Sequence, residues 1–521
     1  MIEAPKANLN IYRNLSADIL AILLCLLFLI MCFTFSTKVN LWGDEAFSLD
    51  LAESSWQTIF YTVDTHLPMY TFLLKLLISL TGSNADREVF IRLWHAVPFA
   101  IGLFLGYRTV GLVTQSRIKA LYVLLAAIFL PSFIFYATNI RMYSLLFLNS
   151  MMFINSIAYL MSNPDVPCTK QFIWFISISF FLILTDYPGL IFYGMGSSFL
   201  IWKIMHRKQY SLLVLMFCPL IAYLIYIDQL RPGLEKIITW HAASPTLGTD
   251  QQQDVKAIIK WIHKAFHPVF DFVNPMAMSL WMSLFIPGIL TVDVVLGSIA
   301  FLWKKQHCNI LRILLVCFAL LWLLEVPTGM SITRAFLPSL FFMVAILVIG
   351  FSDFYFRPLL RVINLSLFTL LLFINIQQIF NPTLQICSMI PYQQIAKDCL
   401  YTANKEHVDT IVLSDNTLNS LSIKRYLRQY IHSSSIQIIL LSLDFTQQSI
   451  PKQPFVFVSH MHEDGRFIDV QYFEKKFGKL TRNLENYIEL ERLPFNQLWR
   501  NEVVGKTSQK FAVSTYMVRS E

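Results

Sequence analysis

The chain has 521 residues, of which 55% are hydrophobic and only 14% are charged. Soluble domains carry about 25% charged residues, so the composition excludes an ordinary soluble protein and indicates a polytopic membrane protein. The formal net charge is +8, but the basic residues stand mostly in short connections between apolar runs, and no basic-aromatic module that would bind nucleic acid is visible.

Apolar runs long enough to cross a membrane recur along most of the chain. A helix needs about 20 apolar residues to span the hydrocarbon core. The first run follows Lys6 and Arg13 and lacks the short apolar core and cleavage site of a signal peptide, so we predict an uncleaved span with a cytoplasmic N-terminus. By the same measure we predict 11 spans, at residues 19–35, 88–107, 118–136, 142–161, 172–186, 187–203, 210–229, 279–303, 311–326, 335–352 and 362–380.

The connections between these spans alternate in their content of Lys and Arg. The short connections at 137–140, 186–189 and 327–333 contain neither residue, whereas the intervening ones do. This is the positive-inside pattern, which places the basic connections in the cytoplasm. It leaves three outer segments, which are the loops 37–87 and 230–278 and the tail 381–521.

The tail differs in character from the rest of the chain. The runs "VDTIVLSD", "IQIILLSL" and "PFVFVSH" predict short buried strands, separated by helical stretches such as "IKRYLRQYI". We therefore predict two domains: a transmembrane domain, residues 1–380, with about 11 helices, and a small α/β domain outside the membrane, residues 381–521. Cys387 and Cys399 both lie in the tail, where they could form a disulfide or remain two free thiols.

Two adjacent acids, Asp44 and Glu45, follow the first span in the segment "LWGDEAFSLD". One interpretation is structural, because acids are favourable at the start of a helix. The other is functional, because ionisable residues at the edge of an apolar span are costly and by default indicate a site. Five further side chains fall at the same predicted outer boundary, namely His66, Arg141, Tyr143, Asp186 and Arg334.

Some of these five have a plainer explanation when taken alone. Arg141 or Arg334 could extend to the lipid headgroups. Asp186 could be an ordinary turn residue in "TDYPG". Their convergence on the face that also carries the acid pair favours the functional interpretation.

The segments around these positions resemble the GT-C superfamily of membrane glycosyltransferases. The closest likeness is to the branch that contains protein O-mannosyltransferases and the aminoarabinose transferases of lipid A. It rests on "WGDEAFS", "DTHLPMYTFLLKLL", "IRMYSLL" and "TRAFLPSL", and with the order of spans it covers roughly residues 10–380. The family usually has two prolines after the His, where this chain has Leu67 and Pro68.

The resemblance implies an inverting glycosyltransferase, in the bacterial inner membrane. Such enzymes move a sugar from a polyprenyl-phosphate carrier to a hydroxyl of a lipid, glycan or protein at the outer face. A lipid phosphate leaves without the acid that a glycosidase supplies, so a single general base suffices. The matching positions imply Asp44 as that base. Glu45, about 100° further around a helix, would orient the acceptor or nearby basic groups.

The resemblance also implies roles for the other residues. A guanidinium offers paired donors to phosphate oxygens, so we expect Arg141 and Arg334 to bind the carrier phosphate. Tyr143 and His66 would add hydrogen bonds there or to the sugar, and Asp186 would contact the sugar.

No metal or other cofactor is favoured by the sequence. The two acids are contiguous rather than separated, and "SHMHEDG" (His460, His462, Glu463, Asp464) is typical of a loop after a strand. Three alternatives stay open: a transporter or flippase of a lipid-linked or small substrate, a membrane-bound ligase or polymerase of glycans, and a non-catalytic GT-C-like partner protein. Transporters often show paired repeats and helices broken near the bilayer centre, and neither is visible here.

Overall fold

The computed structural model divides into two compact units, each described by itself. The first comprises Met1–Thr37, Ala52–Asn274 and Met278–Pro382, and the second comprises Lys38–Leu51, Pro275–Ala277 and Thr383–Glu521. The residues that the structure describes are 5–37, 39–41, 43–61, 68–81, 87–162, 169–186, 188–206, 208–225, 298, 309–325, 336–353, 369, 392–413, 418–431, 436–440, 454–460, 481–488 and 511–518.

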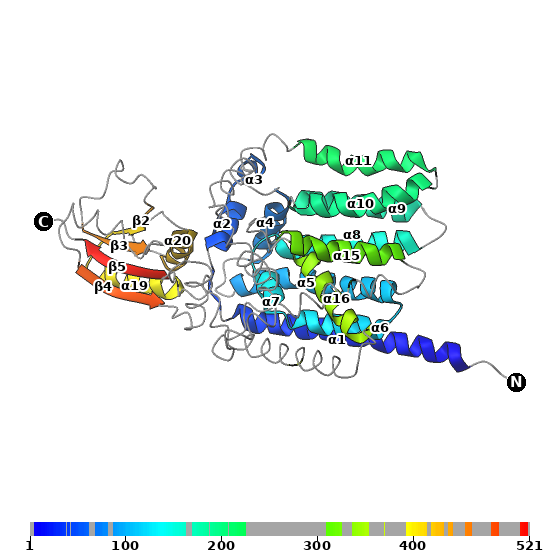
Figure 1. The fold of residues 1–521 in the computed structure, drawn as a ribbon. Coiled ribbons are helices and arrows are strands. Elements are labelled where there is room, and N and C mark those ends of the chain that lie inside the picture. The colour runs from blue at the N-terminus through cyan, green and yellow to red at the C-terminus, as the bar shows by residue number, and fades with distance from the viewer. Residues whose placement is uncertain are drawn as a thin grey trace, which may run out of the picture. The chain divides into compact units, whose positions relative to one another are not determined.

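The first unit is built from helices in its described part (Figure 1). They are α1 (Pro5–Ser36), α3 (Trp56–Tyr61), α4 (Met69–Thr81), α5 (Arg87–Thr114), α6 (Arg117–Ile128), α7 (Pro131–Thr138), α8 (Tyr143–Ser162), α9 (Thr169–Thr185), α10 (Pro188–His206), α11 (Tyr210–Ile225), α15 (Asn309–Glu325) and α16 (Leu337–Asp353). Helices α8, α9, α10 and α11 lie side by side, with α15 against α8 and α10.

Helix α5 is central to the packing of this unit, because it contacts α1, α6, α7 and α8. The ring of Phe99 on α5 stacks on Phe147 of α8, with centroids 4.0 Å apart, and on Phe28 of α1 at 5.7 Å. Gly102, one turn along α5, permits this close approach, since a Cβ there would lie 2.7 Å from Cδ1 of Phe147. The stacked rings, together with the close approach that Gly102 permits, thus stabilise the packing of the central helices.

Three segments of the described helices are long and apolar enough to cross a membrane. They are Leu15–Ser36, Arg87–Thr114 and Tyr143–Met161, and α6 with α7 makes a fourth if that bent pair is one span. The predicted total of 11 spans stays a prediction, because the predicted spans 279–303 and 362–380 lie outside the described residues except at Ser298 and Thr369.

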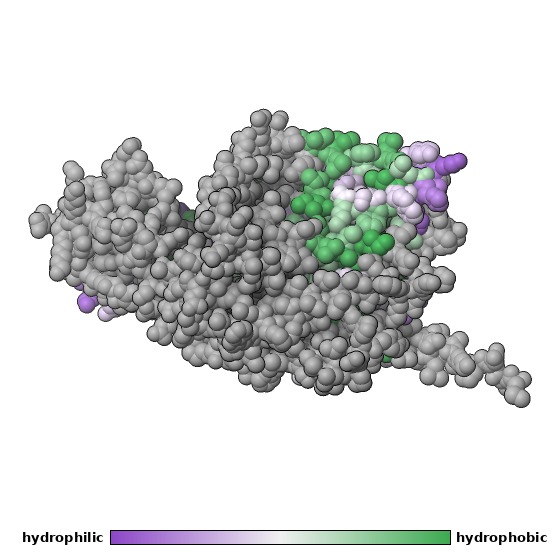
Figure 2. All heavy atoms as spheres, in the orientation of Figure 1, coloured by the Kyte–Doolittle hydropathy of each residue, from purple (hydrophilic) through white to green (hydrophobic). Residues whose placement is uncertain are grey.

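The surface of these helices is strongly apolar. Figure 2 shows a broad hydrophobic area in the region of α10 and α11. Exposed large apolar side chains on these two helices include Ile191, Trp202, Met205, Tyr210, Val214, Phe217, Ile221 and Leu224. Soluble monomeric proteins rarely expose apolar patches of this extent, whereas a surface that contacts the lipid hydrocarbon is apolar. The protein is therefore an integral membrane protein.

Residues 118–136, predicted as one continuous helical span, form two helices. Helix α6 ends at Ile128 and α7 begins at Pro131, and their axes are bent by 71°. Proline has no N–H to donate and disfavours a helical conformation in the residue before it. Leu130 accordingly has extended backbone angles, φ −76° and ψ 117°.

The second unit contains a five-stranded sheet with the strand order β2-β1-β3-β5-β4. Its strands are β1 (Thr410–Leu413), β2 (Gln437–Leu440), β3 (Phe455–His460), β4 (Thr481–Ile488) and β5 (Phe511–Val518). β1 pairs in parallel with β2 and β3, whereas β5 is antiparallel to β3 and β4. The first three strands fall within the three runs from which the sequence predicts strands.

Two amphipathic helices, α19 (Tyr392–Lys405) and α20 (Leu418–Tyr430), pack against each other in this unit, and α19 also contacts β1 and β3. Cys399 lies on the buried face of α19 as a free thiol. Burial raises the pKa of this thiol, so it is held in the protonated form, which is the unreactive one. Cys387, with which the sequence left a disulfide open, lies outside the described residues.

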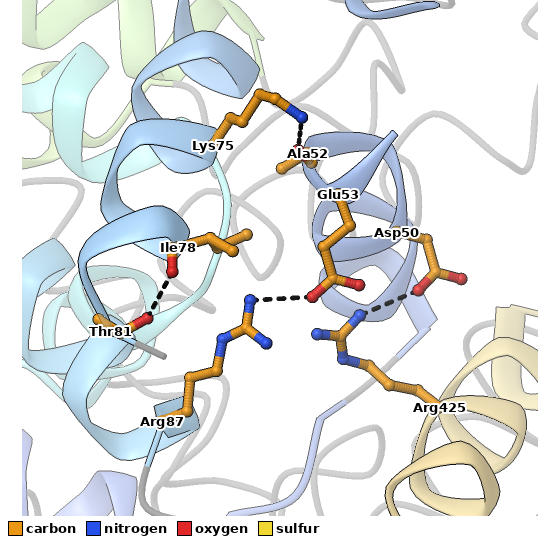
Figure 3. Close-up of polar contacts among 8 residues, drawn as sticks. All are labelled: Asp50, Ala52, Glu53, Lys75, Ile78, Thr81, Arg87 and Arg425. Atoms are coloured by element: carbon orange, nitrogen blue, oxygen red, sulfur yellow. Dashed lines mark hydrogen bonds and ion pairs between the residues drawn. The ribbon is translucent and has the colours of Figure 1, made fainter. Parts of the chain in front are cut away.

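Helix α2 (Gly43–Glu53) belongs to the second unit up to Leu51. It is separated in sequence from the segment Thr383–Glu521 of that unit by more than 300 residues. The last two residues of the helix belong to the first unit, where Glu53 pairs with Arg87 at 2.9 Å and Lys75 donates to the carbonyl of Ala52 at 3.2 Å (Figure 3).

Candidate functional site

Seven site residues are predicted from the sequence, and five lie in the described part of the chain. Asp44 and Glu45 belong to the second unit, and Arg141, Tyr143 and Asp186 belong to the first. His66 and Arg334 lie outside the described residues, so their roles stay predictions.

Arg141 lies in a short buried segment that joins α7 to α8, residues 139–142, which we call the α7–α8 connection. Its side chain is only 8% exposed, although a guanidinium is among the most costly groups to bury. The backbone turns tightly at this point, because the Arg141 N–H donates to the carbonyl of Asn139 at 2.8 Å. The connection therefore holds a cation in a fixed place next to the end of an apolar helix.

Hydrogen bonds from two neighbouring helices stabilise this connection. Arg92 of α5 donates from Nη1 to the carbonyl of Thr138, the last residue of α7, at 3.1 Å. Ser144 of α8 donates from Oγ to the carbonyl of Ala137 at 3.1 Å. The last carbonyls of a helix have no partner within it, so these side chains satisfy groups that burial would otherwise leave without one. They also fix the position of the backbone from which the Arg141 side chain extends.

Tyr143 is the first residue of α8 and is buried. Its ring meets that of Tyr136 on α7 edge to face, with centroids 5.5 Å apart. This contact joins the two helices on either side of the α7–α8 connection. It sets the direction in which the Tyr143 side chain extends.

Asp186 lies between α9 and α10 and is only 1% exposed. The preceding residue, Thr185, accepts a hydrogen bond at Oγ1 from Nδ2 of Asn149 on α8, at 2.9 Å. Asn149 is six residues along α8 from Tyr143, which is about 9 Å of helix. The structure thus places Asp186 at the same end of the packed helices α8 and α9 as Tyr143 and the α7–α8 connection.

The acid pair lies in the first turn of α2, as the structural interpretation of these acids predicted. Gly43 is the first helical residue, so both carboxylates lie within the turn where the helix dipole favours a negative charge. They differ in access: Asp44 is partly exposed, whereas Glu45 is fully buried. Ser48 donates to the carbonyl of Asp44 at 2.9 Å, one turn along the same helix.

Three buried polar residues near the first group were not predicted from the sequence: Arg92, His95 and Asn139. His95 has its Nδ1 2.7 Å from the carbonyl of Ile91 and its Nε2 2.9 Å from the hydroxyl of Tyr70 on α4. A carbonyl only accepts, so Nδ1 carries the proton and a neutral ring accepts from Tyr70 at Nε2. Arg92 and His95 are ionisable residues inside the predicted span 88–107, and this signal could have found them.

Asn139 is two residues from Arg141 and is 1% exposed. Neither its Nδ2 nor its Oδ1 has a hydrogen-bond partner among the described residues. Buried amide groups are nearly always paired, so both atoms are available to a bound polar molecule. The motif "NIRMYSLL" contains this residue, but an amide beside a helix end is common in turns, so the sequence does not single it out.

The described residues contain no group of three or more His, Cys, Asp or Glu side chains that could hold a metal ion. His460 ends β3, and His462, Glu463 and Asp464 lie outside the described part of the chain. In its described part, the first unit therefore holds a buried cation, a buried acid and hydrogen-bonding groups, and the second unit holds an acid pair at a helix start. The first set can bind an anion, and an acid of the second can accept a proton.

No protein-family model matches the sequence, and no curated protein matches it either. Among solved structures, the chain is similar to ArnT from Cupriavidus metallidurans bound to undecaprenyl phosphate. The similarity covers 95% of this chain and 97% of that one, with 10% sequence identity and a TM-score of 0.40. A TM-score and an identity this low establish neither a shared fold nor a shared activity.

Proposed function

We propose that the protein is an inverting glycosyltransferase that uses a polyprenyl-phosphate-linked sugar as donor. The acceptor is a hydroxyl of a lipid, a glycan or a protein at the outer face of the membrane, which we take to be a bacterial inner membrane. The proposal combines the resemblance of the sequence motifs to GT-C enzymes with the character of the described site.

One observation carries most of the weight: Arg141 is buried at the end of an apolar helix. In membrane proteins, ionisable residues buried at the end of an apolar helix by default mark functional sites. A guanidinium matches the geometry of a phosphate, with paired N–H donors. Asp186 and Asn139, buried near the same helix ends, supply the acceptors and donors that sugar hydroxyls need.

Asp44 is the proposed general base. It is the more accessible of the two acids, and a base must lie within hydrogen-bond reach of the hydroxyl that it deprotonates. In the reaction the acceptor oxygen forms a bond to the anomeric carbon while the bond from that carbon to the phosphate oxygen breaks. The acceptor proton passes to the Asp44 carboxylate, and polyprenyl phosphate leaves with the electron pair. Glu45 is assigned to positioning of the acceptor, and His66 and Arg334 to the donor.

The proposal is tested with the purified full-length protein in proteoliposomes that contain a panel of polyprenyl-phosphate sugars. Release of polyprenyl phosphate and transfer of label to lipids, glycans or proteins are measured for the wild type, for Asp44→Asn and for Asp409→Asn. Loss of a general base lowers turnover by about 10²- to 10⁴-fold, so Asp44→Asn should be nearly inactive. Asp409 is an exposed acid of the second unit, and its variant should match the wild type.

Two outcomes would contradict the proposal. Equal turnover in Asp44→Asn and the wild type would return the acid pair to the role of a favourable helix start. If no donor in the panel reacts, a flippase or transporter, or a non-catalytic partner protein, becomes the better explanation. Transport of a labelled lipid-linked substrate across the same proteoliposomes then separates these two.

A further inference from the structure

Two contacts within the second unit join the segment that carries the acid pair to α20. Arg425 of α20 donates from Nη1 to Oδ1 of Asp50 on α2 at 2.9 Å (Figure 3). The Leu41 N–H, two residues before α2 begins, donates to the hydroxyl of Tyr426 at 3.0 Å. Adjacent residues of α20 therefore hold the chain on both sides of Asp44 and Glu45.

The ion pair is well shielded from water. The side chain of Arg425 is 8% exposed and that of Asp50 is 28% exposed. Pairs with both members at the surface contribute little, whereas loss of one partner from a shielded pair leaves a charge without its counter-ion. Helix α20 is itself anchored, because Ile423 and Leu427 are fully buried. Arg425 thus extends from a rigid support.

The geometry of α2 keeps this contact away from the acid that is proposed to react. Six residues of α-helix turn through about 600°, so Asp50 points about 120° away from Asp44. Arg425 can therefore fix the position and rotation of α2 without neutralising the proposed base.

We infer that Arg425 and Tyr426 are positioning residues for the Asp44 carboxylate, and that this is a function of the C-terminal α/β unit. The inference rests on the proposed function for its catalytic part. A base that is displaced by about 1 Å loses much of its effect, so a loosened α2 should lower kcat. Donor binding, which is assigned to residues of the first unit, should change little, so KM for the donor should remain near that of the wild type.

The test uses the full-length protein in detergent micelles and in proteoliposomes. Amide hydrogen exchange over residues 43–51 is measured by mass spectrometry, and kcat and donor KM are measured with the transfer assay. The variants are Arg425→Ala, Asp50→Ala, the double variant, Arg425→Lys and Tyr426→Phe. Arg428→Ala is the matched control, since Arg428 is an exposed residue of the same helix.

We expect Arg425→Ala to speed exchange in α2 at least 10-fold and to lower kcat about 10-fold, with donor KM within twofold of the wild type. Asp50→Ala should change the exchange rate and kcat to the same extent as Arg425→Ala. The double variant should show changes no larger than those of either single variant. Arg425→Lys should restore part of the wild-type exchange rate and part of the wild-type kcat. Tyr426→Phe should cause a smaller change of the same kind. Arg428→Ala should change neither quantity.

Unchanged exchange in Arg425→Ala would overturn the inference, whatever the activity. Faster exchange in an enzyme with unchanged kcat would also overturn it, because the contact would then be structural only. A wild type that is inactive with every donor would overturn the proposed function instead, and the exchange data would still decide whether α20 holds α2. Asp50→Asn, which keeps the size of the side chain, replaces Asp50→Ala if the latter does not fold.

Discussion

Arg141 presents a buried positive charge at a point where the chain turns from one helix to the next. If it binds the carrier phosphate, Arg141→Gln should raise the donor KM by about 10- to 100-fold, since hydrogen bonds to charged groups contribute about 1.5–3 kcal/mol. The variant should stay folded because glutamine keeps much of the length of the side chain and two of its N–H donors without the charge. Arg108→Gln, at an exposed arginine of α5, should leave KM unchanged. Initial rates over a range of donor concentrations measure both. An unaltered KM in Arg141→Gln would exclude phosphate binding by this residue.

The candidate site could be predicted from the sequence where a charge interrupts or borders an apolar run. Arg141 and Asp186 stand out in this way; both are buried in the structure, and their roles stay predictions. Asn139 does not stand out, because an amide beside a helix end is common in turns and only its burial without a partner makes it notable. The pairing of Asp50 with Arg425 is beyond sequence reasoning, since nothing in either segment indicates a contact across 375 positions.

At the scale of elements, close helix packing in the first unit depends on particular glycines. A Cβ at Gly102 would lie 2.7 Å from Cδ1 of Phe147, a residue whose ring is stacked on Phe99 and cannot easily move. We expect Gly102→Ala to destabilise the protein by about 1–3 kcal/mol through overpacking. Gly194→Ala is the control, because nothing lies within 4 Å of a Cβ there. Its effect should be neutral or stabilising, by up to about 1 kcal/mol of helix propensity. Thermal unfolding in detergent compares the two, and equal melting temperatures would contradict the packing argument.

The positions of helices were easier to predict than their shapes. Apolar length alone locates α8, α9, α10 and α16 to within a few residues. The 71° bend between α6 and α7 was missed, although Pro131 is its cause, because hydropathy averages over the residue that ends a helix. Helix α4 lies within the predicted outer loop 37–87, where it was not predicted. Its 13 residues are too few to span a membrane, so a search for spans does not find it.

At the scale of the whole molecule, the orientation in the membrane decides whether the proposed chemistry has access to its substrates. The distribution of Lys and Arg predicts a cytoplasmic connection between α10 and α11 and a C-terminal unit on the outer side. Lys208, in that connection, and Tyr401, on α19, are both exposed and can each be replaced by cysteine.

We expect Tyr401→Cys to react with a membrane-impermeant maleimide in spheroplasts, and Lys208→Cys to react only after the membrane is permeabilised. Labelling is measured above the wild-type background, to which the buried thiols of Cys25, Cys32 and Cys399 should contribute little. Reaction of Lys208→Cys in intact spheroplasts would reverse the orientation. Asp44 and the C-terminal unit would then face the cytoplasm, where nucleotide sugars are available, and a polyprenyl-phosphate donor would no longer be needed to explain the site. The labelling pattern therefore bears on the class of donor before any sugar has been tested.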